Sequence, residues 1–256
     1  MIDFTRERTV DGVTERLFDL TVAGERVPAV IWSPEGASGP RPLILMGHGG
    51  SQHKKIGSLS ARAKIYARKL GYATLAIDAP GHGDRISREE AARLSAEVGA
   101  RVRGEAPSGT FSLMKTMAER TARAVPEWQA ALDAVQGLDF VGRHDRVGYW
   151  GVSMGTAIGV LFLAAEPRIK CAVLGLAGLR AGMDAYAVAA RAITIPLEFV
   201  FQWQDAVASH EAGIALFDAF GSSEKTMHIN PGEHAAIPNF EADSWERFFV
   251  RHLGTA

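Results

Sequence analysis

Short apolar runs alternate with amphipathic segments along most of the chain. Continuous apolar runs of a few residues predict buried strands, and apolar positions that recur every three or four residues predict helices with one buried stripe. Together these patterns predict strands at residues 15–22, 26–32, 43–46, 72–77, 147–150, 171–176, 197–201 and 225–229, and helices at residues 56–70, 126–136, 156–165, 181–192, 207–220 and 239–253.

The order of these segments indicates the fold class. After two N-terminal strands joined at Ala23 and Gly24, strands and helices alternate, which implies parallel crossovers and an α/β fold. Residues 85–125 differ, because they carry eight basic and five acidic residues and few large apolar ones. We predict helical pieces and a loop that lie over the surface as a lid, within a single domain of residues 1–256.

Composition narrows the class of partner. The net charge of −1, from 28 basic and 29 acidic residues, gives no global field that would gather nucleic acid or an anionic membrane. No apolar run approaches the roughly 18 residues of a membrane span, and the N-terminus lacks the apolar stretch of a signal peptide. Cys171 is the only cysteine, so no internal disulfide forms. We therefore expect a cytoplasmic protein with a small-molecule partner, and the sequence leaves a homodimer open.

The strongest chemical signal is the pentapeptide Gly-Val-Ser-Met-Gly at residues 151–155. It follows a predicted strand and precedes a predicted helix, which is the context that a G-x-S-x-G nucleophile turn requires. Glycine on either side of Ser153 removes side chains that would collide with the strand and the helix. The free N–H groups of the helix start would face any oxyanion that forms beside the serine.

A serine oxygen becomes a useful nucleophile only when a base takes its proton and a third group holds that base. Asp205 follows the strand at 197–201 and His234 follows the strand at 225–229, so both belong at the sheet edge where the strands end. Two competitors are weaker: His228 lies inside a predicted strand, and Asp78 ends a strand at the same edge but precedes the serine. We predict Ser153, Asp205 and His234 as the catalytic residues.

An oxyanion hole needs two backbone N–H groups aimed at one point. The residue after the nucleophile, Met154, should supply one of them. The other should come from the glycine-rich loop after the strand at 43–46, where Gly50 is our choice and Gly49 and Ser51 are alternatives.

With these residues in place the chain resembles the α/β-hydrolase enzymes, within them the dienelactone hydrolase and acetyl-esterase-like branch. The matching pieces are G-H-G-G at 47–50, D-A-P-G-H-G at 78–83, G-V-S-M-G at 151–155, Asp205 after a strand, and G-E-H at 232–234. The resemblance implies a mainly parallel eight-stranded sheet with helices on both faces and a serine hydrolase mechanism. Dienelactone hydrolases use a cysteine nucleophile, so serine at position 153 favours ester hydrolysis.

The sequence therefore predicts a carboxylic-ester hydrolase. A thioesterase, lactonase, carbon–carbon bond hydrolase or acyltransferase with the same triad stays open, as does a ligand-binding protein without activity. No cofactor is expected, and the absence of metal-ligand spacing predicts metal independence. The basic residues Lys54, Lys55, Arg101 and Arg103 are either contacts for acidic substrates or part of a solvated face.

Overall fold

The computed structural model describes residues 2–105 and 111–256, with the backbone alone for residues 111–118. All predicted strands are present within two residues of their expected bounds, and most predicted helices within three. The helix predicted at 56–70 consists of α1 and a π-helical turn, Tyr66–Leu70, that continues it. The strands are β1 (Phe4–Val10), β2 (Val13–Val22), β3 (Glu25–Pro34), β4 (Leu43–Gly47), β5 (Ala73–Ile77), β6 (Val147–Val152), β7 (Ile169–Gly175), β8 (Leu197–Gln202) and β9 (Lys225–Asn230). The helices are α1 (Gly57–Ile65), α2 (Arg88–Val102), α3 (Phe111–Val135), α4 (Met154–Ala165), α5 (Asp184–Ala192), α6 (His210–Ala219) and α7 (Glu241–Leu253).

Within the described residues the strands form one nine-stranded sheet in the order β1-β2-β3-β5-β4-β6-β7-β8-β9. The first three strands and β5 pair in antiparallel fashion, and the pairs from β5 through β4 to β9 are all parallel. The sheet is thus mainly parallel, as predicted, but it has one strand more than the eight expected. The additional strand is β1, whose polar and mostly exposed residues carry no hydrophobic signal.

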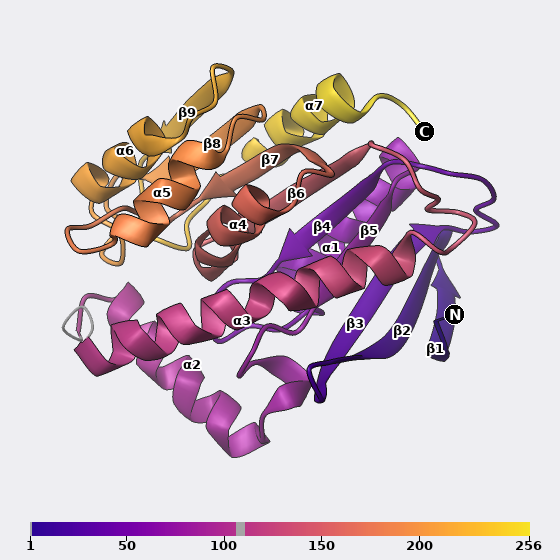
Figure 1. Ribbon diagram of the computed structural model, residues 1–256, viewed down its shortest axis with the longest axis horizontal. Helices are drawn as coiled ribbons and strands as arrows, with labels where there is room; N and C mark the ends of the chain where they lie inside the picture. Colours follow the sequence, from indigo (N-terminus) through magenta and orange to yellow (C-terminus); the bar gives the residue numbers. More distant parts are fainter. Residues whose placement is uncertain (1, 106–110) are drawn as a thin grey trace.

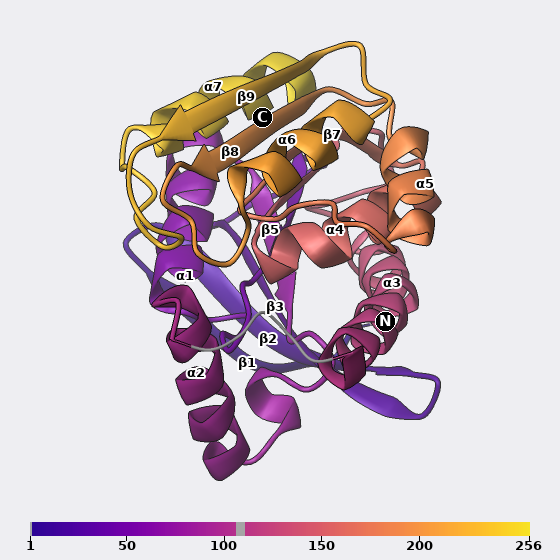
Figure 2. The same ribbon diagram turned by 90° about the vertical axis from the view of Figure 1, so that its left-hand side faces the viewer.

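Helices cover both faces of the sheet, and each face has its own apolar core (Figures 1 and 2). On one face α3 and α4 contribute Trp128 and Phe162, both buried against Tyr149 of β6. On the other face α7 contributes Trp245 and Phe249. Both faces of the central strands are therefore covered, which explains why those strands are apolar at nearly every position.

Within the described residues the predicted lid segment contains α2 and the first part of α3. Helix α2 lies outside the layer formed by α3 to α6, below α3 in Figure 1. The helix predicted to start at Pro126 begins instead at Phe111, so the predicted boundary was wrong and Pro126 lies inside α3. Ala124 and Trp128 are both buried, so the apolar stripe of α3 that faces the core continues across the proline. The free energy gained by burying these side chains offsets the loss of the helix hydrogen bond that proline cannot donate.

An ion pair anchors the start of this segment to the body of the protein. The guanidinium of Arg85 donates to both carboxylate oxygens of Glu127 on α3, at 2.7 and 2.9 Å, and both side chains are buried. Bidentate pairs of this geometry are among the strongest charge-assisted hydrogen bonds. The start of the segment is thus held against α3.

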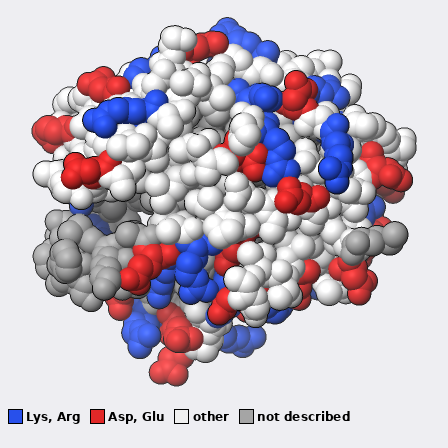
Figure 3. Space-filling model, viewed as in Figure 1, with Lys and Arg blue, Asp and Glu red and all other residues white. Residues whose placement is uncertain are grey.

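Positive and negative side chains are interspersed on the face shown in Figure 3. Within the described residues, no helix combines the length and apolar character needed to cross a bilayer.

Candidate active site

Ser153 sits on a sharp turn between β6 and α4. Its backbone φ of +57° and ψ of −117° lie in a region that L residues rarely adopt. A side-chain carbon on Gly155 would lie 2.6 Å from the carbonyl oxygen of Gly47, and one on Gly151 would lie 2.9 Å from the Gly155 backbone. Both glycines are therefore required by close backbone contacts, and the strain is concentrated at the serine.

The structure brings the three predicted side chains together in one chain of hydrogen bonds. His234 Nε2 lies 2.9 Å from Ser153 Oγ, and His234 Nδ1 lies 2.7 Å from Asp205 Oδ2. The other carboxylate oxygen, Oδ1, accepts the backbone N–H groups of Val207 at 2.7 Å and Ala208 at 3.0 Å. The Asp205 side chain is fully buried, so its charge is directed at the imidazole rather than at water.

This arrangement fixes the tautomer of the histidine. A carboxylate only accepts hydrogen bonds, so Nδ1 of His234 carries the proton and Nε2 presents a lone pair to the serine hydroxyl. The geometry can therefore remove a proton from Ser153 and stabilise the imidazolium that results.

Two glutamines that the sequence reasoning missed hold the loops of the acid and the histidine together. Gln202 donates from Nε2 to the Ala236 carbonyl at 2.7 Å. The Gln204 side chain accepts the Gly232 N–H, and its backbone N–H donates to the Gly232 carbonyl at 3.0 Å. The signal that could have revealed them is the pair of glutamines at positions 202 and 204, where the mainly apolar strand β8 ends at the edge of the sheet that carries the site.

The competing acid, Asp78, is engaged elsewhere. Its buried carboxylate accepts the Lys54 ammonium at 2.7 Å, the Lys54 backbone N–H at 2.8 Å and the Asp84 N–H at 2.9 Å. Lys54 also pairs with the Asp84 carboxylate at 2.5 Å. This cluster fastens the loop after β4 to the loop after β5.

Two histidines in the loops after β4 and β5, His48 and His82, also bind backbone groups. His48 Nε2 accepts the Ala79 N–H at 3.1 Å, while Nδ1 lies 2.9 Å from the Gly49 carbonyl. Burial lowers the pKa of His48 to about 4, so the ring stays neutral at ordinary pH. His82 contacts the Pro80 carbonyl in the same way, at 3.0 Å, and burial lowers its pKa as well.

The predicted oxyanion donors come from the start of α4 and from the loop after β4, the strand that neighbours β6 in the sheet. Met154 is the first residue of α4, where backbone N–H groups have no partner within the helix. Gly50 follows β4, whose last residue pairs with Gly151 of β6. Within the described residues the Gly50 N–H donates to no acceptor. A side-chain carbon built on Gly50 would meet Val98 of α2 at 3.7 Å, so α2 covers this loop.

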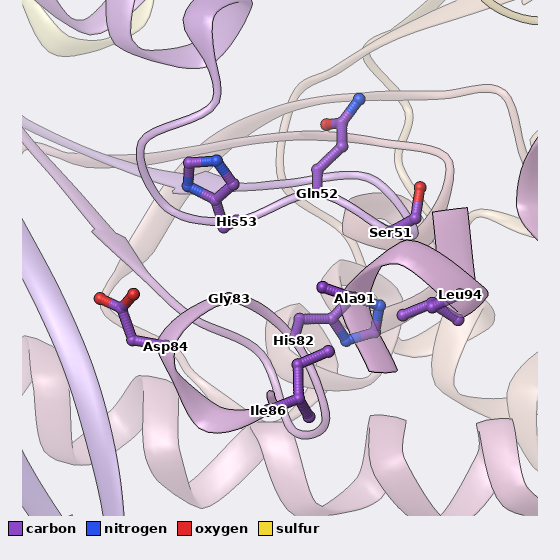
Figure 4. Close-up of a pocket in the computed structure, with 9 residues that line it drawn as sticks. All are labelled: Ser51, Gln52, His53, His82, Gly83, Asp84, Ile86, Ala91 and Leu94. Carbon is purple, nitrogen blue, oxygen red and sulfur yellow. The ribbon is translucent and has the colours of Figure 1, made fainter. Parts of the chain in front are cut away.

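A cavity of about 190 Å³ lies beside the same loop (Figure 4). Its walls come from the loops after β4 and β5 and from α2, and its lining residues are Ser51, Gln52, His53, His82, Gly83, Asp84, Ile86, Ala91 and Leu94. None of the three hydrogen-bonded residues Ser153, Asp205 and His234 lines it, so it is a neighbour of the site.

The basic residues considered as substrate contacts are mostly paired within the protein. Lys54 is buried with two aspartates, Lys55 binds Glu15 at 2.5 Å, and Arg103 binds Glu105 at 2.9 Å. These pairs favour a structural role for the basic residues over contact with an acidic substrate.

Comparison with known proteins places these features in context. No family model matches the chain. YtaP of Bacillus subtilis (strain 168), whose own assignment as a hydrolase is provisional, is 30% identical over 178 residues, which is 65% of this chain and 53% of the relative. The chain thus spans about half the length of this curated relative.

Two solved structures extend the comparison over nearly the whole chain. A cold-adapted esterase from an Arctic intertidal metagenomic library, bound to polyethylene glycol, is 32% identical with a TM-score of 0.80 over 98% of this chain and 99% of that one. An acetyl xylan esterase from Paenibacillus sp. R4 is 16% identical with a TM-score of 0.76 over 99% and 88% of the two chains, which shows a shared fold.

Proposed function

Because this chain belongs to the α/β-hydrolase family of esterases, we propose that it is a carboxylic-ester hydrolase that acts through an acyl-serine intermediate. The observation that carries the proposal is the continuous chain of hydrogen bonds from Ser153 through His234 to Asp205, at 2.9 and 2.7 Å. The strained serine backbone supports the same conclusion, since such strain is retained where it serves a function.

The proposed reaction has two halves. His234 Nε2 takes the Ser153 proton as Oγ attacks the ester carbonyl, and Asp205 stabilises the imidazolium. The N–H groups of Met154 and Gly50 hold the oxyanion, and the imidazolium then gives its proton to the departing alcohol. In the second half, His234 takes a proton from a water molecule as the water attacks the acyl-serine carbonyl, and the bond to Ser153 Oγ breaks with return of the proton to the serine. This step releases the carboxylic acid.

We propose that the described part of the predicted lid segment, from α2 to Gly104, forms one wall of the substrate site; residues 106–110 lie outside the described residues. Val98 of α2 approaches Gly50, and a side-chain carbon on Gly104 would lie 3.8 Å from Ala206, next to the triad acid. These two contacts lie on opposite sides of Ser153 along the sheet edge, at the loops after β4 and β8. A small-molecule ester would therefore bind under α2.

The proposal extends to partners and place of action. The partner is a small-molecule ester rather than nucleic acid or a membrane, and the protein acts in the cytoplasm as a monomer or a homodimer. The mixed surface charge and the single, buried Cys171 support this.

The same triad could act on thioesters, lactones or carbon–carbon bonds, or transfer the acyl group to an alcohol. Ester hydrolysis is favoured because the solved structure that is 32% identical over 98% of this chain is described as an esterase. A panel of p-nitrophenyl esters, thioesters and lactones, assayed with and without added alcohol, separates these reactions.

Ser153→Ala tests the nucleophile. We expect kcat for p-nitrophenyl acetate to fall by roughly 10⁴- to 10⁶-fold, with fluorophosphonate labelling lost and the melting temperature little changed. Ser60→Ala is the matched control, since the Ser60 hydroxyl on α1 has no partner within the described residues. Near-normal turnover by Ser153→Ala would reject the nucleophile, and an unlabelled, inactive wild type would favour a binding protein.

A further inference from the structure

Three side chains that can bind a metal meet on the α7 face of the sheet, apart from the triad. Glu198 is on β8, His228 is on β9 and Glu241 is the first residue of α7. In the parallel register His228 lies opposite Val200, two residues beyond Glu198, so both side chains point to the same face. The three residues are 30 and 13 positions apart in the sequence, which is why spacing along the chain did not indicate them.

The ligand atoms are close enough to share one ion. His228 Nδ1 lies 2.8 Å from Glu241 Oε2 and 3.6 Å from Glu198 Oε1. One ligand atom from each residue lies within 4.8 Å of both others. Asn230 donates to the remaining Glu241 oxygen at 2.8 Å and so orients that carboxylate toward the histidine.

One buried oxygen in this cluster makes no hydrogen bond within the described residues. The Glu198 side chain is only 6% exposed, and within the described residues its Oε1 makes no hydrogen bond, although it faces His228. A buried carboxylate oxygen without a donor is costly, and native proteins rarely leave one.

We propose that Glu198, His228 and Glu241 form a binding site for a divalent transition-metal ion, with zinc as the best fit. One imidazole nitrogen and two carboxylate oxygens are ligands that zinc accepts, with metal–ligand bonds of about 2.0–2.2 Å. Tetrahedral bonds of that length separate ligand atoms by about 3.3–3.6 Å. The observed 2.8 and 3.6 Å separations bracket these values. Magnesium and calcium fit less well because they prefer oxygen ligands throughout.

Exposure of the site to solvent fits this assignment. The His228 side chain is 34% exposed while both glutamates are buried, so an ion could enter beside the imidazole and keep a water as its fourth ligand. A cation would also offset the negative charges of Glu198 and Glu241, two buried carboxylates that both contact His228.

The site would be structural rather than catalytic. His228 and Glu241 flank the loop of residues 231–240 that carries His234, and Glu198 is on the strand that precedes Asp205. An ion bound to all three would fasten the start and the end of that loop to β8. The inference does not depend on the proposed esterase activity, because no residue of the triad is a ligand.

Zinc binding tests the proposal directly. Purified full-length protein is stripped with a chelator, and zinc is titrated with a chromophoric competitor and counted by elemental analysis. We expect one zinc ion per chain, a rise of several degrees in the melting temperature, and an affinity at least about tenfold lower in Glu198→Gln and in His228→Gln. Ser153→Ala should bind zinc as tightly as the wild type.

His210→Gln is the matched control, because His210 forms an exposed histidine–glutamate pair at 3.2 Å outside the cluster. It should bind zinc like the wild type. Circular dichroism establishes that each variant is folded, and His228→Gln provides the comparison if Glu198→Gln does not fold. Absence of stoichiometric zinc in the wild type, or wild-type affinity in folded His228→Gln, overturns the site.

Discussion

Asp205→Asn would test how the buried acid controls the histidine. In the structure Asp205 Oδ1 accepts two backbone N–H groups, from Val207 and Ala208, while Oδ2 accepts from His234 Nδ1. An asparagine has one oxygen and one NH₂ group. Its oxygen must take the Oδ1 position, because an NH₂ group there would oppose two donors. The NH₂ group then points at His234.

The consequence for the histidine follows from hydrogen-bond direction. The amide donates to Nδ1, so the ring proton moves to Nε2, which then donates to Ser153 Oγ 2.9 Å away instead of accepting its proton. The general base is lost together with the charge that stabilises the imidazolium. In serine hydrolases with this triad the same change lowers kcat by about 10⁴-fold, which corresponds to roughly 5.5 kcal/mol in the activation barrier.

Steady-state kinetics with p-nitrophenyl acetate between about pH 6 and 9 would measure this effect. We expect KM to change little, because the amide replaces the carboxylate without a change in shape. Asp218→Asn, at an exposed position on α6, is the matched control and should retain wild-type kcat. A kcat for Asp205→Asn within about tenfold of the wild type would refute the role of the acid in setting the tautomer.

Two further substitutions test the packing around the site. Gly155→Ala would place a carbon 2.6 Å from the last backbone carbonyl oxygen of β4. We therefore expect a loss of about 1–3 kcal/mol in unfolding free energy and a lower kcat, measured by denaturant melts and ester assays. Gly57→Ala, with nothing within 4 Å, is the control and should change neither; equal behaviour of the two variants would contradict the close packing of the turn at Ser153. Lys54→Met would leave the Asp78 carboxylate buried without its cation and should cost about 3–5 kcal/mol, whereas Lys55→Met, in a partly exposed pair, should cost less than about 1 kcal/mol. Similar losses of unfolding free energy for both variants would show that the buried Lys54–Asp78 pair contributes no more to stability than the partly exposed Lys55–Glu15 pair.

Local patterns in the sequence predicted those parts of the fold that depend on local chemistry. Continuous apolar runs such as Leu43–Met46 became buried strands because both faces of the sheet are covered. Gly71 ends the helical segment after α1 with a φ of +72°, as a glycine terminator should. The strand β1 escaped prediction because its edge position leaves its residues exposed, and exposed strands need no apolar pattern.

The candidate site was predictable for a related reason. Parallel strands all end at one edge of the sheet, so chain order alone placed Ser153, Asp205 and His234 at that edge. Chain order also favoured Asp205 over Asp78, which ends a strand at the same edge but precedes the serine. Only the structure shows the contacts behind that choice: Asp205 accepts from His234, whereas Asp78 is paired with Lys54.

The sequence by itself thus determined the order of the elements, the turn that strains Ser153 and the edge where the functional side chains emerge, because these features depend on neighbours along the chain. The tertiary structure decided which distant side chains meet. Strand register and helix packing bring Glu198, His228 and Glu241 to one point and give Lys54 its two aspartates. Such contacts are set by the summed packing of the whole sheet, and no short segment of sequence carries that information.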